Sequence, residues 1–257
     1  MSGGVFYSKF YFVDPVTLNN QFIVFKEVGE VLGTLDIGAL TPEDLVNESA
    51  RAMNEVGSQI YAMVLNRTTR KVTVSAPGAF EVNVNNGSHD QDNIWNTLGF
   101  TTNRGAGVSH ESDIAMGSEW APQFPPQKFT PFIDWEDSVD AVKNQAAEGD
   151  TEVVSFGDVR FMEADFMFIT DLDMGTQSDI KTDLTAVSKA RAFLQFMRTV
   201  RPMEFMEDAF VPVIFDKILI ESTPESKLGT AFKLKKMTSM GLYEHYTTGL
   251  LKFREIS

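Results

Sequence analysis

One short stretch constrains the fold more than any other, "TPEDLVNESARAMNEVG", residues 41–57. Thr41 is a favoured N-cap residue, Pro42 fits the first helical position, and the two acids that follow suit the positive end of a helix dipole. Apolar residues then recur at three- and four-residue spacing up to Gly57, a typical helix terminator. The pattern predicts a helix over 41–56 with one buried face.

Short aromatic and β-branched runs flank this helix, which is typical of strands. Residues 5–13 and 21–26 predict a hairpin, because Asp-Pro and Asn-Asn between them form turns. After the helix, the runs at 59–66, 71–76 and 79–84 predict a three-strand meander joined by the turns RTTR and PG. A helix packed on a small antiparallel sheet follows from this order.

The stretch "NNGSHDQDNIWNTLGF", residues 85–100, is a polar loop that ends in large apolar residues. It predicts a short helix over 91–98. Ile94, Trp95 and Leu98 then lie at i, i+1 and i+4 and face the open side of the sheet. We therefore expect a lid over a small core.

The C-terminal part of the chain predicts a second β-rich unit. "TEVVSFGDVRFMEADFMFITDLD" indicates two strands broken at Gly157, and apolar spacing predicts a helix over 183–200 that ends before Pro202. Three later runs, VPVIFDKILIES, TAFKLKKM and LLKFREI, alternate apolar and charged residues, as half-buried antiparallel strands do.

Residues 105–150 separate the two parts. Within them, "SEWAPQFPPQKFTPF" holds four of the chain's ten prolines, and proline opposes both helix and ladder pairing. We expect an extended arm followed by an acidic linker. The arm either lies over its own domain or packs on a neighbouring subunit, in which case the subunit-interface residues are Trp120, Phe124, Phe129 and Phe132.

The predicted fold class is therefore α+β. It consists of two small β-rich domains, 1–104 and 151–257, each an antiparallel sheet or sandwich with one principal helix, joined by the extended Pro- and aromatic-rich arm of 105–150.

Amino-acid composition excludes several classes of function. Acids outnumber bases 36 to 22, for a net charge of −14, so this surface repels a phosphate backbone and we expect no nucleic-acid partner. The chain has no cysteine, which excludes disulfides and thiolate chemistry. No run nears the roughly 18–20 apolar residues of a membrane span, so we expect no membrane partner and a soluble protein made in a cytoplasm.

Charge is also segregated along the chain. Residues 134–165 hold ten acids and two bases, whereas residues 226–257 hold six bases and two acids. A solvated acidic face is one interpretation. The other is head-to-tail contact between identical copies, because opposite patches on one chain complement each other.

Motifs for catalysis are not found. The sequence lacks a GxSxG elbow, a Walker loop and a complete GxGxxG. His89, His110 and His245 do not have the spacing that places two imidazoles on one metal. "DLDMGTQSD", 171–179, lacks the ligands and closing glutamate of a calcium loop. We expect no enzyme activity, no cofactor and no metal.

The stretch 38–100 has an ordered set of pieces: a "GxLTxEDL" helix start, an amphipathic helix ending in "AMN", a "VTVSA" strand and an "LGF" lid. This order resembles a module of tailed-bacteriophage virion structural proteins. In the C-terminal part, "GDVRFMEADFMFITDLD", "ARAFLQFMRTV", "PMEFMED" and "FDKILIES" are similar in order to distal tail and baseplate-ring proteins. The resemblance covers about two thirds of the chain and transfers no functional residue.

The resemblance implies a non-enzymatic structural component of a phage tail. Such a protein forms a homo-oligomeric ring at the distal tail or baseplate, contacts other virion tail proteins, and is assembled in the host cytoplasm before it resides in the virion. One alternative is a neck connector or capsid decoration protein. Another is a carbohydrate- or host-surface-binding module, in which exposed Trp95 or Trp120 stacks on sugars.

Overall fold

The computed structural model describes most of the N-terminal part and selected strands of the rest: residues 9–120, 135–145, 151–165, 169–170, 202–206, 215–220, 235–236, 245–247 and 250–256. The chain divides into two compact units. Tyr11–Glu119 forms one, called here the helix-bearing unit, and Met1–Phe10 with Trp120–Ser257 forms the other, the ribbon-bearing unit. The described elements are one helix and antiparallel sheets, so the α+β class with two β-rich parts is confirmed.

The helix α1 spans Pro42–Val56, as predicted. Thr41 caps it, because Asp44 N donates to Thr41 Oγ1 at 3.2 Å. At the other end, Gly57 N donates to the Met53 carbonyl oxygen at 2.8 Å. The cap and the apolar spacing together fix both the start of the helix and its buried face.

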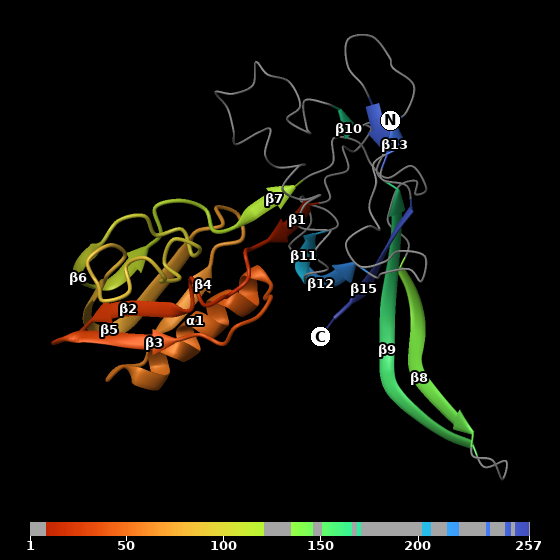
Figure 1. Ribbon diagram of the computed structural model, residues 1–257, viewed down its shortest axis with the longest axis horizontal. Helices are drawn as coiled ribbons and strands as arrows, with labels where there is room; N and C mark the ends of the chain where they lie inside the picture. The colour runs from red at the N-terminus through yellow and green to blue at the C-terminus, as the bar shows by residue number, and fades with distance from the viewer. Residues whose placement is uncertain are drawn as a thin grey trace. The chain divides into compact units, whose positions relative to one another are not determined.

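The sheet of the helix-bearing unit has five strands (Figure 1). They are β2 (Phe22–Lys26), β3 (Glu30–Thr34), β4 (Ala62–Leu65), β5 (Val72–Val82) and β6 (Arg104–Glu111). The order is β3-β2-β5-β4, and β6 also pairs with β5. The long β5 holds the sheet together, because β4 pairs with its first half, β2 with its end, and β6 runs beside both.

The predicted hairpin of 5–13 with 21–26 is wrong. β1 (Lys9–Phe12) belongs to the sheet of the ribbon-bearing unit, and β2 pairs instead with β3. The intervening Asp-Pro and Asn-Asn do form a turn, since Thr17 N donates to Asn20 Oδ1 at 2.7 Å. This turn stabilises itself locally and does not join two paired strands.

The meander prediction is also wrong in its third strand. Residues 71–76 and 79–84 merge into the single strand β5, which runs through Pro77 and Gly78 with an irregular register against β6. Pro-Gly marks a bulge within a strand here, because Gly78 N finds a side-chain partner in Gln59 Oε1 at 2.6 Å. The remaining strand is β6, which the sequence had placed in the arm.

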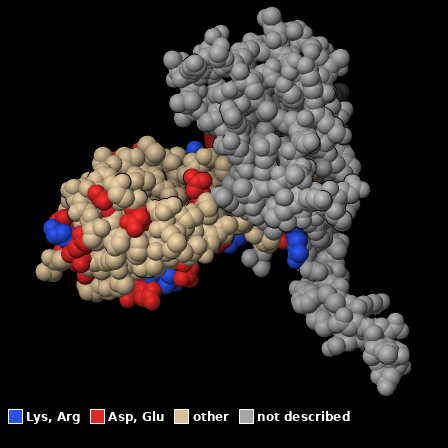
Figure 2. Space-filling view, in the orientation of Figure 1, with Lys and Arg blue, Asp and Glu red and all other residues tan. Residues whose placement is uncertain are grey.

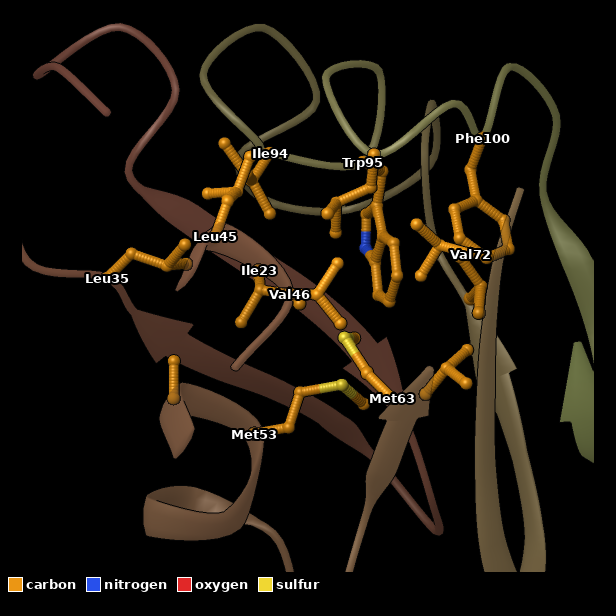
Figure 3. Close-up of a cluster of buried hydrophobic side chains, with 14 of the residues drawn as sticks. Ile23, Leu35, Leu45, Val46, Met53, Met63, Val72, Ile94, Trp95 and Phe100 are labelled. Atoms are coloured by element: carbon orange, nitrogen blue, oxygen red, sulfur yellow. The ribbon is translucent and has the colours of Figure 1, made fainter. Parts of the chain in front are cut away.

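The apolar end of the 85–100 loop fills the core (Figure 3). Ile94, Trp95, Leu98 and Phe100 are all 0% exposed. Trp95 Nε1 also donates to the Val24 carbonyl oxygen at 2.7 Å, which satisfies the one polar atom of its side chain. The predicted lid over a small core is confirmed.

The lid is not the predicted helix, however. Leu98 N donates to the Ile94 carbonyl oxygen at 3.1 Å, but the surrounding residues form turns. Gly99 leaves the turn with φ 89°, and a Cβ there would meet the Ile114 carbonyl oxygen. Buried Asn93 fixes the entry, because its Nδ2 donates to three backbone carbonyls and its Oδ1 accepts from Trp95 N. Side-chain hydrogen bonds therefore replace the helical ladder.

The other described strands form a seven-stranded sheet in the order β7-β1-β11-β12-β15-β9-β8 and a three-stranded sheet in the order β10-β14-β13. Their remaining strands are β7 (Ser118–Trp120), β8 (Trp135–Gln145), β9 (Thr151–Asp165), β10 (Ile169–Thr170), β11 (Met203–Met206), β12 (Phe215–Ile220), β13 (Lys235–Lys236), β14 (His245–Thr247) and β15 (Leu250–Glu255).

Phe10 of β1 packs on rings from the C-terminal half of the chain. Its ring centroid lies 4.9 Å from that of Phe205 and 5.8 Å from that of Phe253. All three side chains are 0% exposed. Phe10 of β1 is thus part of the core of this unit.

Two predictions in this part are corrected. β9 runs unbroken through Gly157, so the two strands predicted there are one. Residues 105–111 and 135–145, assigned to an arm and linker, are strands β6 and β8. The strands predicted around β12 and β15 are confirmed. The predicted helix over 183–200 lies outside the described residues.

β8 and β9 form a long two-stranded ribbon (Figure 1). Their pairing extends from Trp135 opposite Met162 to Gln145 opposite Thr151, with one irregularity between Val139 and Ala141. β15 pairs with β9 only at 161–165. Among the described strands, the rest of the ribbon therefore has no third strand beside it.

Candidate interaction surfaces

The four aromatics predicted as a subunit interface are placed only in part. Trp120 ends β7, and its side chain is outside the described set. Phe124, Phe129 and Phe132 lie outside the described residues. Trp95, the other candidate for stacking on sugar, is fully buried, which removes it from any surface role.

Two of the three histidines, His89 and His110, have structural partners. His89 Nδ1 lies 3.0 Å from Asp92 Oδ1, and its ring centroid lies 4.0 Å from that of Phe22. His110 Nε2 lies 2.9 Å from the Phe80 carbonyl oxygen, and His110 is 9% exposed. Within the described ranges, no group of three or more His, Asp or Glu is arranged to hold a metal.

No helix in the part of the chain that the structure describes is both long and apolar enough to span a membrane. On the helix-bearing unit, charged side chains are scattered in small groups among uncharged residues on the visible face (Figure 2). The features of this unit that bear on interaction are therefore its sheet edges, its exposed apolar side chains and the point where the chain leaves it.

The outer edge of β3 is covered by Arg51 of α1. Leu35 N donates to the Gln21 carbonyl oxygen at 2.8 Å. Because antiparallel pairs alternate between hydrogen-bonded and non-hydrogen-bonded, the next pair, Phe22 with Thr34, directs the Thr34 carbonyl away from β2. Arg51 Nη2 donates to that oxygen at 3.3 Å. An edge carbonyl that another strand would use is thus occupied within the molecule.

Arg51 is held in this position by acids of its own helix. Its Nη2 lies 2.6 Å from Glu48 Oε1, and its Nη1 lies 2.7 Å from Glu55 Oε2. The hydrogen bond from Arg51 is the main cause that lowers the pKa of the Glu48 carboxyl, against the opposing effect of partial burial. The carboxyl therefore stays ionised and keeps the guanidinium over the β3 edge.

The outer edge of β6 is covered in the same way by Arg104. Ser112 N donates to the Val72 carbonyl oxygen at 2.8 Å, so the neighbouring Glu111 carbonyl points away from β5. Arg104 Nη2 donates to that oxygen at 3.2 Å. It also pairs with Asp113 Oδ1, which locks the guanidinium against the strand.

The Asp113 carboxylate accepts hydrogen bonds from several groups around Arg104. Its Oδ2 accepts from Thr101 N at 2.8 Å and from Thr102 N at 3.1 Å. Desolvation acts to raise the pKa of Asp113, but these bonds and Arg104 outweigh it and lower the pKa to about 2. The carboxylate is consequently ionised at any pH above that range and joins the lid exit to the end of β6.

One corner of the helix-bearing unit gathers exposed aliphatic side chains. Val28 is 101% exposed at the β2–β3 turn, Ile60 is 78% exposed before β4, and Val56 is 43% exposed at the end of α1. Glu27 ties these segments together, because its carboxylate accepts from Ser58 N at 2.9 Å and Ser58 Oγ at 2.6 Å. These hydrogen bonds from Ser58 to Glu27 hold the β2–β3 turn against the segment that follows α1.

Buried Tyr61 completes this tie, since its hydroxyl donates to Glu27 Oε1 at 2.6 Å. Desolvation acts to raise the pKa of Glu27. The hydrogen bonds from Ser58 and Tyr61 outweigh this effect, so the pKa of Glu27 is lowered. Burial and the same bond raise the pKa of Tyr61. Both groups therefore keep the protonation states that the bond requires across neutral pH.

Arg70 marks the place where the chain enters and leaves the helix-bearing unit. It has φ 56°, the one positive φ of a non-glycine residue in the described part of the chain. Its guanidinium lies 6.0 Å from the Tyr11 ring centroid, and its Nε lies 3.6 Å from Glu119 Oε2. Met116 N donates to its carbonyl oxygen at 2.8 Å. One residue thus contacts both terminal segments of this unit.

The ribbon presents the longest uncovered strand edges of the described structure. β8 ends the seven-stranded sheet, so among the described strands only β9 flanks its eleven residues. On β9, residues 151–160 lie outside the stretch that pairs with β15. Edges of this kind offer rows of backbone N–H and C=O groups to another chain.

Register places some of the ribbon's charges opposite each other. Glu163 of β9 lies opposite Lys252 of β15, so the acidic and basic segments already meet within one molecule at this point. Asp137 lies opposite Arg160. By contrast, Glu136 lies opposite Phe161. Part of the acidity of the ribbon is therefore not matched across the ladder.

Comparison with known proteins gives no identification. No protein family matches this chain, and no curated protein has a matching sequence. Function has to be inferred from the surfaces described above.

Proposed function

We propose that this chain is a non-enzymatic structural component of a phage tail, which assembles through copies of itself into a ring at the distal tail or baseplate and joins tail tube, hub and fibres. The resemblance of the module at 38–100 and of the C-terminal strand order supports the location. The ribbon formed by β8 and β9 supports the assembly.

The ribbon is the observation that carries this proposal. Among the described strands, only residues 161 and 162 of β9 are paired on both sides, with β8 and β15, and the ribbon continues for ten further β9 residues with β8 alone. A two-stranded ribbon is marginally stable in water, and independent stability needs a third strand or a packed face. A protein that functions as an assembly supplies that cover from its neighbour.

Shortening the ribbon tests the assembly. Residues 140–157 are replaced by Asn-Gly, which joins the paired residues Val139 and Asp158 with a two-residue hairpin turn. We expect native mass spectrometry to find a closed oligomer for the natural chain and a folded monomer for the shortened chain. Leu18→Ser, at a side chain that is 68% exposed, is the surface control and should leave the oligomer intact.

A natural chain that stays monomeric at every concentration would refute the assembly. The location is tested separately, by immunogold labelling of purified particles with antibody to the chain. Label at the tail tip supports the proposal, whereas label at the neck or on the capsid favours a connector or decoration protein.

A further inference from the structure

The outer edge of β8 is the acidic edge of the ribbon. Between them, β8 and β9 carry seven acids and two bases. The bases are Lys143 and Arg160, and Arg160 lies opposite Asp137 in the register. The acids of β8 itself are Glu136, Asp137 and Asp140. An approaching strand therefore meets backbone hydrogen-bonding groups and negative charge together.

A basic strand edge exists elsewhere in the same chain. β13, Lys235–Lys236, is the last strand in the order β10-β14-β13 and pairs with β14 at Thr247 and Tyr246. It lies in the run "KLGTAFKLKK", 227–236, which has four lysines and no acid. Of the basic C-terminal segment, Lys252 is already placed opposite Glu163, whereas the described register sets the lysines of β13 opposite uncharged residues.

We infer that the outer edge of β8 in one copy docks against the β13 edge of the next copy. The inference rests on the proposed assembly and specifies its contact. Two different surfaces of one chain meet, so the contact is head-to-tail, and a head-to-tail contact closes into a ring when its rotation closes. Charge complementarity selects β13 over a second ribbon, because two β8 edges would bring like charges together.

Charge exchange is the test. Glu136→Lys with Asp140→Lys reverses the β8 edge, and Lys235→Glu with Lys236→Glu reverses the β13 edge. Each pair should raise the concentration at which half of the chain is assembled by about tenfold or more, since every 1.4 kcal/mol of contact energy is about a factor of ten. The chain that carries all four substitutions has both edges reversed and should assemble again.

Asp14→Lys with Asp90→Lys is the matched control. Both residues are exposed in the helix-bearing unit, and the pair changes the net charge by the same amount as the β8 pair. It should leave the assembly midpoint unchanged. Circular dichroism of every variant separates a lost contact from a lost fold, and the recovery in the fourfold variant does so independently.

Cysteine pairing gives a second readout, because the natural chain has none. One chain carries Asn144→Cys or Ser138→Cys on β8, and another carries Lys236→Cys on β13. Only strands in direct contact bring Cα atoms within the roughly 7 Å that a disulfide allows. We expect disulfide dimers in the mixture, and no dimers from either chain alone.

The outcomes separate this inference from the proposed function. An oligomer that ignores charge reversal, or dimers of the β8-cysteine chain with itself, overturns the β8–β13 contact while the assembly stands. A natural chain without any oligomer overturns both. Assembly that strengthens with salt also contradicts the contact, because added salt shortens the range of attraction between opposite charges, which is about 8 Å at physiological ionic strength.

Discussion

The two β-sheet regions of this chain treat their edges in opposite ways. In the helix-bearing unit, Arg51 covers the Thr34 carbonyl and Arg104 covers the Glu111 carbonyl. In the ribbon-bearing unit, β8 and residues 151–160 of β9 extend past their last neighbouring strand. In the first sheet, arginines of the same molecule occupy carbonyls at the edges of β3 and β6, and the second sheet ends in a ribbon suited to a partner.

The difference lies in what each strand has beside it. The helix α1 lies against β2, β3 and β4, and buried side chains from the lid complete the core on which it packs. Among the strands that the structure describes, the ribbon is held at one end, where β15 pairs with 161–165. A stable domain and an assembly element can therefore coexist in one chain. Experiments that disturb one of them should leave the other unchanged.

Trp95→Ala has the largest expected effect. Removing a fully buried indole from a closed core costs about 3–5 kcal/mol in the free energy of unfolding. Urea denaturation followed by circular dichroism measures the loss for this unit. Val28→Ala, at a fully exposed side chain, is the control and should stay within about 0.5 kcal/mol. A small loss in the free energy of unfolding for Trp95→Ala would mean that Trp95 is not essential to the core of the helix-bearing unit.

Arg70→Ala should cost about 2 kcal/mol, because it removes a partly buried ionic contact and places alanine at a positive φ. Arg70→Gly loses the same contacts but tolerates the backbone, so it should be about 1 kcal/mol less destabilised. Thermal melting should give the order natural chain, glycine, alanine. Equal melting temperatures for the two variants would show that the positive φ at residue 70 does not contribute to the loss of stability.

Asp113→Asn should remove a pH dependence. The pKa of Asp113 is lowered to about 2 in the folded chain, from about 3.9 when unfolded. Its contribution, about 1–2 kcal/mol, is therefore fully present above pH 4 and is lost as the pH falls toward 2. Urea midpoints of both chains across this range should converge at the acidic end. A constant difference between them contradicts the assignment.

Arg51→Ala with Arg104→Leu has the smallest expected effect on stability, about 1 kcal/mol or less for each exposed contact. Its effect on association should be larger, because the outer edges of β3 and β6 then offer the unsatisfied Thr34 and Glu111 carbonyls. Light scattering should detect new concentration-dependent association. If the double variant behaves as the natural chain does, these arginines do not close the edges.

Local signals predicted local structure well. Thr41 and Pro42 predicted the start of α1, and the apolar residues of the lid predicted a plugged core. Pro77-Gly78 was misleading, because the choice between a turn and a bulge depends on Gln59, nineteen residues away. The lid turn was mistaken for a helix because Asn93 supplies its hydrogen bonds through a side chain.

The pairing of 59–66 with 71–76 across RTTR was predicted and is confirmed by β4 and β5, but pairing between strands distant in the sequence was not predicted. Nothing in the run RGAGVSHE indicates that β6 lies beside β5, since its glycines resemble a linker. The residues that cover the edges were missed for the same reason, because Arg51 and Arg104 look like ordinary surface charges until their carbonyl partners are known. The strand pattern of 151–165 predicted β-structure where β9 lies, but nothing in the acidic segment before it predicted that β8 pairs with β9.

Hydrogen exchange tests the central claim, that the ribbon needs a second copy, most directly. Amides of 141–145 and 151–155 should exchange rapidly in dilute monomer and become protected when the chain assembles. Amides of β5 and of the lid should be protected in both states. Ribbon amides that are protected in the dilute monomer, or that still exchange rapidly in the oligomer, would contradict the account.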